Sequence, residues 1–365
     1  MKNKIINKLR ITFKIIVIIN LIVATYYFLG RNMGRGDESL FIIDLELIKS
    51  AGWIAAIKKS ISIPYMLLAY PLSFIFDSYI ALRIVSVALI SGMLGYFYIV
   101  RKENSKDLFY YLIFYISCES VFFSGTNDTL FFVSLIIFLN EVYLIRQNKV
   151  KDLNILLSFL IISIFTRQLF VVYLPVILIG IYIVYKSKIR LNRKSLIPFG
   201  LFLFFIFMNI PSLIEKGRLS YDDKSAPKET NVSWSQRQYL AQLMVNNGEL
   251  ENFQHPSWEV TRAYLDKNGE DSLPDGIING MTFDYALTIK EFFKDFAYSV
   301  GTSTRSFGLM LFITFFYFGN QMLKDRNNLL DNFIPLSTLV MLSIFSLIIM
   351  SYVETRWLDP VFIMT

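Results

Sequence analysis

Apolar residues run along this chain in blocks long enough to cross a membrane, and short polar segments separate the blocks. A membrane-spanning helix needs about 20 mostly apolar residues. The first block, 11–30, follows a basic start, and we interpret it as a retained first helix rather than a cleaved signal peptide. Further spans are predicted at 79–100, 107–123, 129–146, 153–166, 168–186, 194–214, 305–321 and 333–352, and 357–365 has the character of the start of another. The pattern predicts an all-α polytopic membrane protein with about nine or ten transmembrane helices.

Two stretches near the N-terminus break this simple pattern. Residues 31–60 form a loop after the first span, with apolar positions at helical spacing (Leu40, Ile43, Leu47 and Ile48) and Asp44, Glu46 and Lys49 between them. That spacing predicts a helix lying along the membrane surface, with the charged residues on a solvated face. Residues 61–76 are apolar but short and contain prolines, so we expect an interfacial or re-entrant segment.

A long polar loop divides the predicted spans into two groups. Residues 215–300 contain no long apolar run, but 234–246, 256–267 and 283–299 have helix-like patterns. We therefore expect three parts: an N-terminal transmembrane module over 1–214, an extracytoplasmic subdomain over 215–300, and C-terminal transmembrane helices over 301–365.

Composition removes several classes of protein. Of 365 residues, 54% are hydrophobic and 18% charged, where an average soluble domain has about 25% charged residues. One cysteine, Cys118, excludes a disulfide scaffold, and one histidine, His255, argues against zinc hydrolases and histidine proton relays. The high hydrophobicity excludes a disordered chain.

The distribution of charge orients the predicted spans. With the N-terminus in the cytoplasm, the cytoplasmic segments hold 18 basic and 5 acidic residues, whereas 215–300 holds 9 basic and 14 acidic residues. Cytoplasmic loops are enriched in Lys and Arg, so this orientation is the favoured one. The formal charge of +7 therefore reflects topology, and we expect no nucleic-acid partner.

With this topology, ionisable residues gather at the extracytoplasmic ends of the spans. Charges near membrane depth are costly and point by default to function. They are Asp37 and Glu38 after the first span, Arg83 in the second, Asp128 between the third and fourth, Arg167 beside Gln168 between the fifth and sixth, Arg305 at the eighth, and Glu354, Arg356 and Asp359 after the ninth. Snorkelling explains Arg83 and Arg305 at least as well as function does, and tryptophans such as Trp53 and Trp357 equally suit interfacial anchors.

The acidic pair Asp37-Glu38 suggests a specific chemistry. A carboxylate at the mouth of the bundle can accept a proton from an incoming hydroxyl, and guanidinium groups can bind a phosphate by paired contacts. A base and a phosphate clamp on one membrane face suit the transfer of a sugar from a lipid phosphate to an acceptor hydroxyl.

The chain also resembles a known family. Gly36-Asp37-Glu38-Ser39, followed by a surface helix ending at Gly52-Trp53, resembles the first extracytoplasmic loop of the GT-C superfamily of multi-spanning glycosyltransferases, which includes protein mannosyltransferases and the lipid A aminoarabinose transferase. Further stretches resemble the family in order along the chain: Ile63-Pro64-Tyr65, Phe76-Asp77-Ser78 with Ile80-Ala81-Leu82-Arg83, Gly125-Thr126-Asn127-Asp128, Thr166-Arg167-Gln168 with Leu174-Pro175, and loosely Arg356-Trp357 with Pro360.

The resemblance implies a GT-C-like bundle, an inverting transfer and roles for individual residues. Asp37 would be the catalytic base supported by Glu38, and Asp128 an active-site acid. Arg167 and Arg356, with Arg83 and Arg305 as further candidates, would bind the lipid phosphate, and Gln168, Trp53, Trp357 and Glu354 would contact substrate. The partners would be membrane lipids, a polyprenyl-phosphate-linked sugar and a lipid-linked, glycan or protein acceptor, with the site on the extracytoplasmic face of the cell membrane.

The metal requirement differs among members of this family. Asp37 and Asp128 could together hold a divalent cation, Mg²⁺ or Mn²⁺, through oxygen ligands. Because the first loop lacks a D-x-D triplet, we expect a metal-independent site.

Two other functions compete with this interpretation. A polymerase of O-antigen or capsule repeat units also has many spans and a large external loop, but the acidic pair directly after the first span is not expected there. A transporter or flippase predicts inverted repeats and ionisable residues near the midplane. Neither feature is evident, since 194–214 and 333–352 carry no charge in their interiors.

Overall fold

In the computed structural model, residues 2–32, 37–222, 230–307, 310–324 and 330–364 are described, and these ranges contain helices and no strand. Five helical segments are long and apolar enough to cross a membrane: Ile5–Leu29, Ser78–Val100, Asp128–Arg146, Arg193–Lys216 and Leu330–Leu347. The protein is therefore a helical membrane protein, as the sequence pattern predicts.

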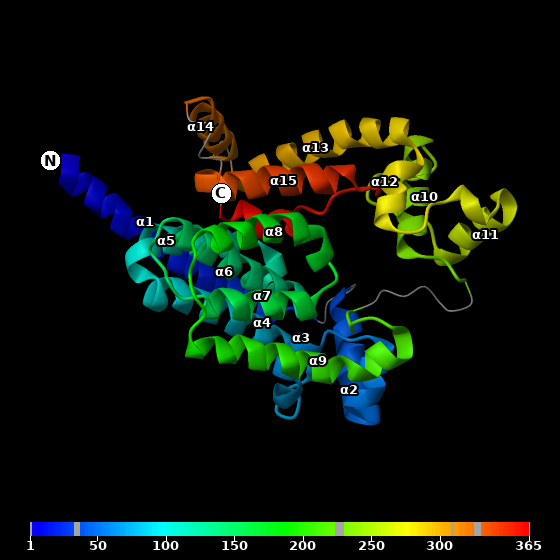
Figure 1. The fold of residues 1–365 in the computed structure, drawn as a ribbon, viewed down its shortest axis with the longest axis horizontal. Coiled ribbons are helices and arrows are strands. Elements are labelled where there is room, and N and C mark those ends of the chain that lie inside the picture. The colour runs from blue at the N-terminus through cyan, green and yellow to red at the C-terminus, as the bar shows by residue number, and fades with distance from the viewer. Residues whose placement is uncertain (1, 33–36, 223–229, 308–309, 325–329, 365) are drawn as a thin grey trace. The chain divides into compact units, whose positions relative to one another are not determined.

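The chain forms two compact units, Met1–Asp222 and Asp223–Ile363. The first contains α1 (Lys2–Leu29), α2 (Asp37–Lys59), α3 (Ile63–Leu72), α4 (Ser78–Gly95) with η1 (Tyr96–Val100), α5 (Lys102–Cys118), η2 (Ser120–Phe123), α6 (Asp128–Arg146), α7 (Asn154–Thr166), α8 (Phe170–Lys186), η3 (Arg193–Ser195) and α9 (Leu196–Lys216) (Figure 1). The second contains α10 (Trp234–Asn246), α11 (Trp258–Asn268), η4 (Glu270–Ser272), α12 (Ile277–Phe283), α13 (Tyr285–Phe307), α14 (Met310–Lys324), α15 (Phe333–Leu347), η6 (Thr355–Leu358) and α16 (Asp359–Phe362).

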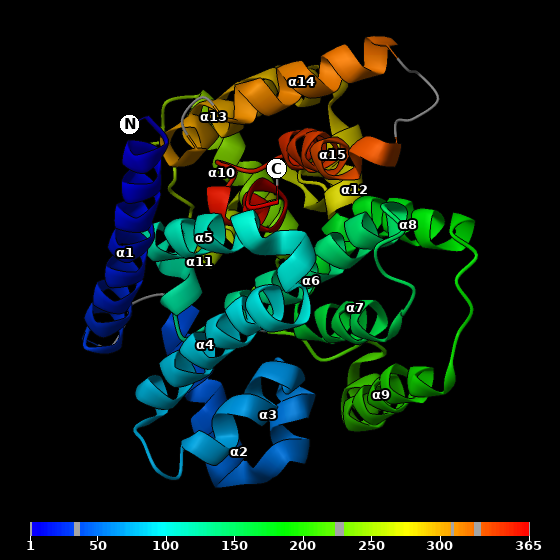
Figure 2. The same ribbon diagram turned by 90° about the vertical axis from the view of Figure 1, so that its left-hand side faces the viewer.

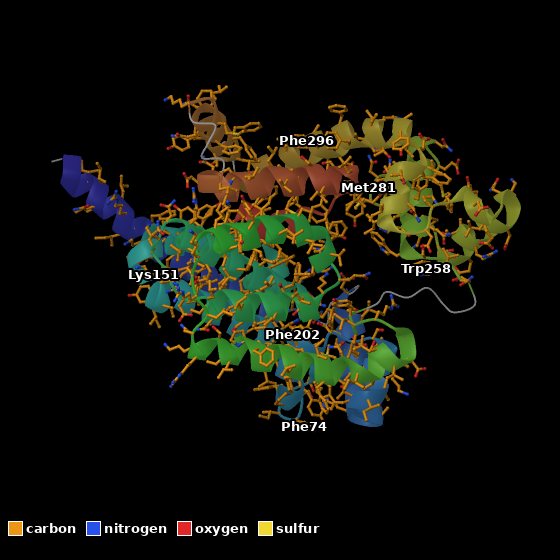
Figure 3. The ribbon with its side chains drawn as sticks, in the orientation of Figure 1. Phe74, Lys151, Phe202, Trp258, Met281 and Phe296 are labelled. Atoms are coloured by element: carbon orange, nitrogen blue, oxygen red, sulfur yellow. The ribbon has the colours of Figure 1, made fainter. Side chains whose placement is uncertain are left out.

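Helix α6 is the centre of the first unit. Of the residues in its apolar stretch, 94% are buried. The helix packs against α4, α7 and α8 (Figure 2). Close approach of α8 depends on Gly180, where a Cβ atom would lie 3.0 Å from the Phe138 ring. The outward faces of the unit carry large apolar side chains such as Phe74 and Phe202 (Figure 3). Such faces suit contact with lipid.

Several predicted spans are shorter in the structure. At three of the predicted spans, the described apolar helix has only 10 to 17 residues. These helices are Leu108–Cys118, Asn154–Thr166 and Phe170–Lys186. The predicted span 305–321 falls on the end of α13 and the start of α14, with residues 308–309 between them outside the described ranges. Residues 61–76, expected not to cross, contain the ten-residue helix α3, which ends shortly after Pro71.

Helix α2 exists as predicted, but its buried face differs from the prediction. Phe41, Leu45 and Ile48 are buried, whereas Ile43 is exposed. Positions 41, 45 and 48 also have helical spacing, so the sequence of this helix has two possible apolar faces. The face with Phe41, Leu45 and Ile48 is the buried one in the structure, where α2 packs against α4 and α9. At Gly52 the backbone turns to φ 82°, a left-handed value that interrupts the helix and that glycine adopts without a steric penalty.

In the second unit, the helix-like patterns at 234–246, 256–267 and 283–299 correspond to α10, α11 and α13. Helix α13 continues to Phe307 and packs along α15 (Figure 1). We expected 215–300 and 301–365 to form separate parts. In the structure, most of both ranges belongs to a single compact unit, Asp223–Ile363.

Candidate functional site

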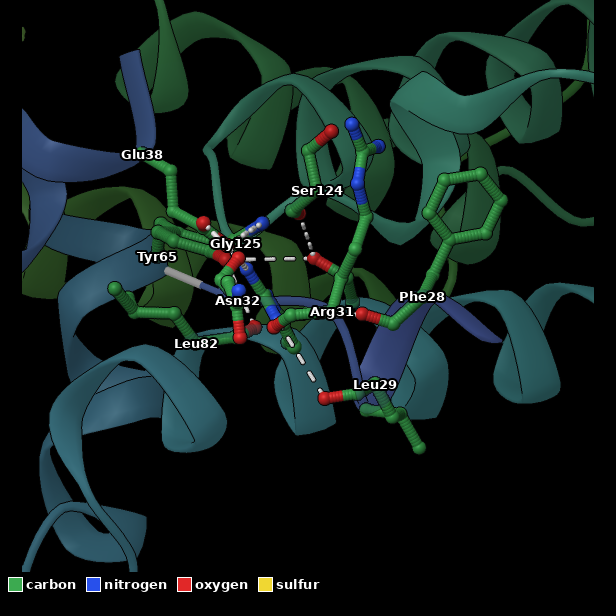
Figure 4. A network of polar contacts seen from close by, with 11 residues as sticks. Phe28, Leu29, Arg31, Asn32, Glu38, Tyr65, Leu82, Ser124 and Gly125 are labelled. Carbon is green, nitrogen blue, oxygen red and sulfur yellow. Dashed lines mark hydrogen bonds and ion pairs between the residues drawn. The ribbon is translucent and has the colours of Figure 1, made fainter. Parts of the chain in front are cut away.

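A buried ion pair joins the start of α2 to α4. Arg83 Nε donates to Glu38 Oε1 and Arg83 Nη2 donates to Glu38 Oε2, both at 2.7 Å (Figure 4). The two side chains are almost completely buried. A paired, two-point contact between guanidinium and carboxylate is the strong geometry for such a charge pair, so it fixes the position of the first turn of α2.

The remaining donors of Arg83 reach the end of α1. Nη2 also donates to the carbonyl of Asn32 at 3.1 Å, and Nη1 donates to the carbonyls of Phe28, at 3.3 Å, and Arg31 (Figure 4). A cation near a helix C-terminus satisfies carbonyls that have no partner within the helix. Arg83 therefore connects α1, α2 and α4, and its donors are used by the protein itself.

The turn before α6 contacts the same ion pair. The Gly125 N–H donates to Glu38 Oε1 at 3.2 Å, and the Ser86 hydroxyl donates to the Ser124 carbonyl at 2.6 Å. A Cβ atom at Gly125 would lie 2.8 Å from Glu38 Oε1 and 2.9 Å from Leu82 Cβ, so only glycine allows this approach. The turn over 124–128 is thus held directly against Glu38.

Polar contacts connect this turn to the end of α7. Asn127 Nδ2 and the Ser62 hydroxyl both donate to the Thr166 carbonyl, at 3.0 and 2.7 Å. The next residue, Arg167, forms an ion pair with Asp128, the first residue of α6. The Asp128 side chain is 2% exposed and the Arg167 side chain 20%. The carboxylate is therefore buried while part of the Arg167 side chain reaches the surface.

These contacts bring several of the predicted residues together at one end of the first unit. Asp37, which is partly buried, precedes Glu38 at the start of α2, and the chain of contacts continues through Gly125 to Asp128 and Arg167. Within the described residues, the Thr126 hydroxyl in the middle of this turn is buried and has no hydrogen-bond partner. A buried hydroxyl without a partner is uncommon in folded proteins, and a bound water, ion or substrate is one explanation for it.

The other predicted residues of the first unit lie elsewhere or at its surface. Gln168 is exposed beside Arg167. Trp53 is partly buried, and its ring packs against Tyr70 at 5.4 Å in the core formed by α2 and α3. The structure thus gives Trp53 a packing role. Gly34, Arg35 and Gly36 lie outside the described residues.

The predicted residues near the C-terminus belong to the second unit. Arg356 forms an ion pair with Glu354, and the Trp357 ring stacks on Phe345 at 5.8 Å. Asp359 begins α16 and is buried. The side chain of Arg305, on α13, lies outside the described residues.

Sequence reasoning missed a second arginine–glutamate pair in the first unit. Arg101 donates to both carboxylate oxygens of Glu141, at 2.7 and 2.8 Å, and Glu141 is completely buried in α6. Tyr96 donates to the same carboxylate and accepts from Asn140 Nδ2 at 2.7 Å. The signal for this network was the pair Asn140-Glu141 inside an otherwise apolar span.

Neither a metal centre nor a known relative identifies the site. In the part of the chain that the structure describes, no three His, Cys, Asp or Glu side chains gather in a way that could hold a metal ion. Comparison with known proteins finds no matching family model, no matching curated protein and no matching solved structure. Function must therefore be argued from the chemistry of these residues.

Proposed function

We propose that this membrane protein is a glycosyltransferase of the GT-C type, which moves a sugar from a polyprenyl phosphate to an acceptor hydroxyl on the extracytoplasmic face. One observation carries the proposal. The start of α2, the turn over 124–128 and the end of α7 are joined by polar contacts, so that Asp37, Asp128 and Arg167 belong to one end of the first unit. Carboxylates and a guanidinium in one place suit acid–base work on a phosphate-bearing substrate.

The reaction follows from the chemistry of these groups. The acceptor oxygen attacks the anomeric carbon of the donor, and its O–H proton passes to the Asp37 carboxylate. The bond between the anomeric carbon and the phosphate oxygen breaks, and the lipid phosphate leaves with the bonding electrons. A single displacement of this kind inverts the anomeric configuration. General-base catalysis typically contributes about 10²–10⁴-fold to such a step.

Arg167 is the best placed residue for the leaving phosphate. Its side chain is 20% exposed, and Asp128 holds its guanidinium from a buried position. A buried partner that orients an arginine reduces the entropy that phosphate binding would otherwise cost. In this proposal Asp128 positions Arg167, and Asp37 is the catalytic base.

Glu38 and Arg83 take a different role in the proposal. Both side chains are buried and satisfied by each other and by backbone groups, so we assign them to positioning Asp37 rather than to proton transfer or phosphate binding. Phosphate binding by Arg305 and Arg356, and substrate contacts by Gln168, Glu354 and Trp357, remain predictions from the resemblance. The donor is a polyprenyl-phosphate sugar, and the acceptor is a glycan, protein or lipid-linked hydroxyl.

Release of polyprenyl phosphate in proteoliposomes tests the proposal. We expect the wild-type chain to release it from a polyprenyl-phosphate sugar when acceptor is present, and Asp37→Asn to lose this activity. The exposed Asp271→Asn variant is the matched control and should keep full activity. Absence of bond cleavage with movement of intact donor across the membrane would indicate a flippase, and repeated extension of a lipid-linked oligosaccharide would indicate a polymerase.

Binding of polyprenyl phosphate without a sugar tests the role of Arg167. Arg167→Ala should weaken binding of this lipid more than binding of a soluble acceptor, because the lost group contacts only phosphate. Equal weakening of both would contradict the assignment.

A further inference from the structure

One face of helix α13 in the second unit buries a row of polar residues, and the opposite face exposes apolar ones. The buried positions follow each other at intervals of three or four residues, which places them on one face of the helix: Thr288, Glu291, Asp295, Ser299 and Ser303. The opposite face exposes Tyr285, Ile289 and Phe293, the last to 69%. The polar face packs in the direction of α15, which runs alongside (Figure 1). A buried polar face needs hydrogen-bond or charge partners.

The first acid on this face has its partners. Asn246 Nδ2, on α10, donates to Glu291 Oε1 at 2.9 Å, and Lys294 Nζ lies 2.9 Å from Glu291 Oε2. The Glu291 charge is therefore neutralised by Lys294 and its oxygens are hydrogen-bonded.

The second acid, one turn further along, does not. Asp295 is 3% exposed, accepts no hydrogen bond from any residue that the structure describes, and has its Oδ2 atom completely buried. Lys294 is engaged with Glu291, and α15 contains no ionisable residue. Arg356, on the neighbouring η6, forms its ion pair with Glu354. One buried carboxylate is thus left without a cation among the described side chains.

A hydroxyl and an amide oxygen share this condition. Ser299 is completely buried, and its hydroxyl has no partner among the described residues, although Thr302 and Ser303 on the same helix both donate to carbonyls of the preceding turn. Gln242, on α10, donates from Nε2 to Asn246 Oδ1 at 3.0 Å, and its Oε1 atom is buried and unpartnered within the described ranges. Asp295 and Ser299, one turn apart on the same face of α13, therefore both have a buried oxygen atom without a partner among the described residues.

We propose that Asp295 and Ser299, one turn apart on the same face of α13, form the core of a binding site for a small monovalent cation of the Na⁺ class. Carboxylate, hydroxyl and amide oxygens are the ligands that hard cations prefer. A single uncompensated negative charge matches a single positive charge, whereas a divalent ion would leave a buried positive charge in excess. Burial raises the pKa of Asp295 to about 7, with the Glu291 charge adding to the rise and Lys294 opposing it, so a proton competes with the cation below that pH. The site does not depend on the proposed transfer reaction.

Thermal unfolding of the full chain in detergent micelles at pH 8 tests the site. Na⁺ is the probe, and choline at equal ionic strength is the reference because it is a much larger cation that oxygen ligands cannot surround closely. We expect the unfolding midpoint of the wild type to rise by about 2–4 °C in Na⁺ relative to choline. Asp295→Asn should abolish this difference and should be at least as stable as the wild type in choline, since it removes the uncompensated charge.

Two further variants keep the test decisive. Asp284→Asn changes an exposed acid just before the same helix and should retain the full response to Na⁺. Ser299→Ala removes one ligand without changing charge and should reduce the response, which covers the case in which Asp295→Asn fails to fold. No difference between Na⁺ and choline in the wild type, or an equal rise in Asp295→Asn or Ser299→Ala, would overturn the proposal.

Discussion

Two buried carboxylates, Glu38 in the first unit and Asp295 in the second, have opposite surroundings. Glu38 receives two hydrogen bonds from Arg83 and one from the Gly125 N–H. Asp295 receives none from the described residues. A buried carboxylate whose partners are complete holds the structure together, whereas one whose partners are missing must be neutralised by a proton or by a bound cation. The partners of a buried charge, more than its burial, thus indicate its role.

The largest expected effect comes from removing the partner of Glu38. Arg83→Met leaves a buried, unpaired carboxylate and frees the carbonyls at the end of α1, so we expect the free energy of unfolding to fall by about 3–5 kcal/mol. Denaturant unfolding in detergent measures this loss. The double variant Glu38→Gln with Arg83→Met should recover part of it, because no buried charge then remains. A double variant as unstable as Arg83→Met would contradict the charge argument.

A smaller effect is expected from crowding the same carboxylate. Gly125→Ala would place a methyl group 2.8 Å from Glu38 Oε1 and 2.9 Å from Leu82 Cβ, and we expect a loss of about 1–3 kcal/mol in unfolding free energy. Gly92→Ala is the control, since a Cβ atom there meets no atom within 4 Å, and it should leave stability unchanged or increase it by up to about 1 kcal/mol. Similar losses in both variants would mean that the close contact at Glu38 is unimportant.

Asp44 tests whether the difference between Glu38 and Asp295 comes from their hydrogen-bond partners or from the unit to which each belongs. It lies on the same helix as Glu38, but its Oδ2 atom is buried without a partner among the described residues. Burial and the nearby Asp222 raise the pKa of Asp44 from 3.8 to about 7, while Lys59 opposes the rise. The folded protein therefore holds a proton between these pH values that the unfolded chain has lost, so stability falls as pH increases from about 4 to about 7.

Asp44→Asn removes this dependence. Compared with the wild type, the variant should have an equal unfolding midpoint near pH 4 and a higher one at pH 8. Thermal unfolding at both pH values is the measurement. A variant that gains stability equally at both would show that the gain does not come from ionisation.

Local pattern predicted the helical, membrane-spanning character of the chain and the positions of Asp37, Asp128 and Arg167 at helix ends. It could not predict that Arg83 pairs with Glu38, because the two residues are 45 positions apart and only the packed structure brings them together. The polar face of α13 was likewise missed. The spacing of Glu291, Asp295 and Ser299 places these residues on one side of the helix expected at 283–299, but only the packed structure shows that this side is buried.

Turnover of Asp37→Asn tests the central claim most directly, with Glu38→Gln measured beside it and both rates divided by the folded fraction. If Asp37 is the base and Glu38 only positions it, Asp37→Asn should fold as stably as the wild type and lose about 10²–10⁴-fold in release of polyprenyl phosphate. Glu38→Gln should instead unfold more easily, and its folded molecules should lose far less activity than Asp37→Asn does. Wild-type turnover in folded Asp37→Asn would contradict the account.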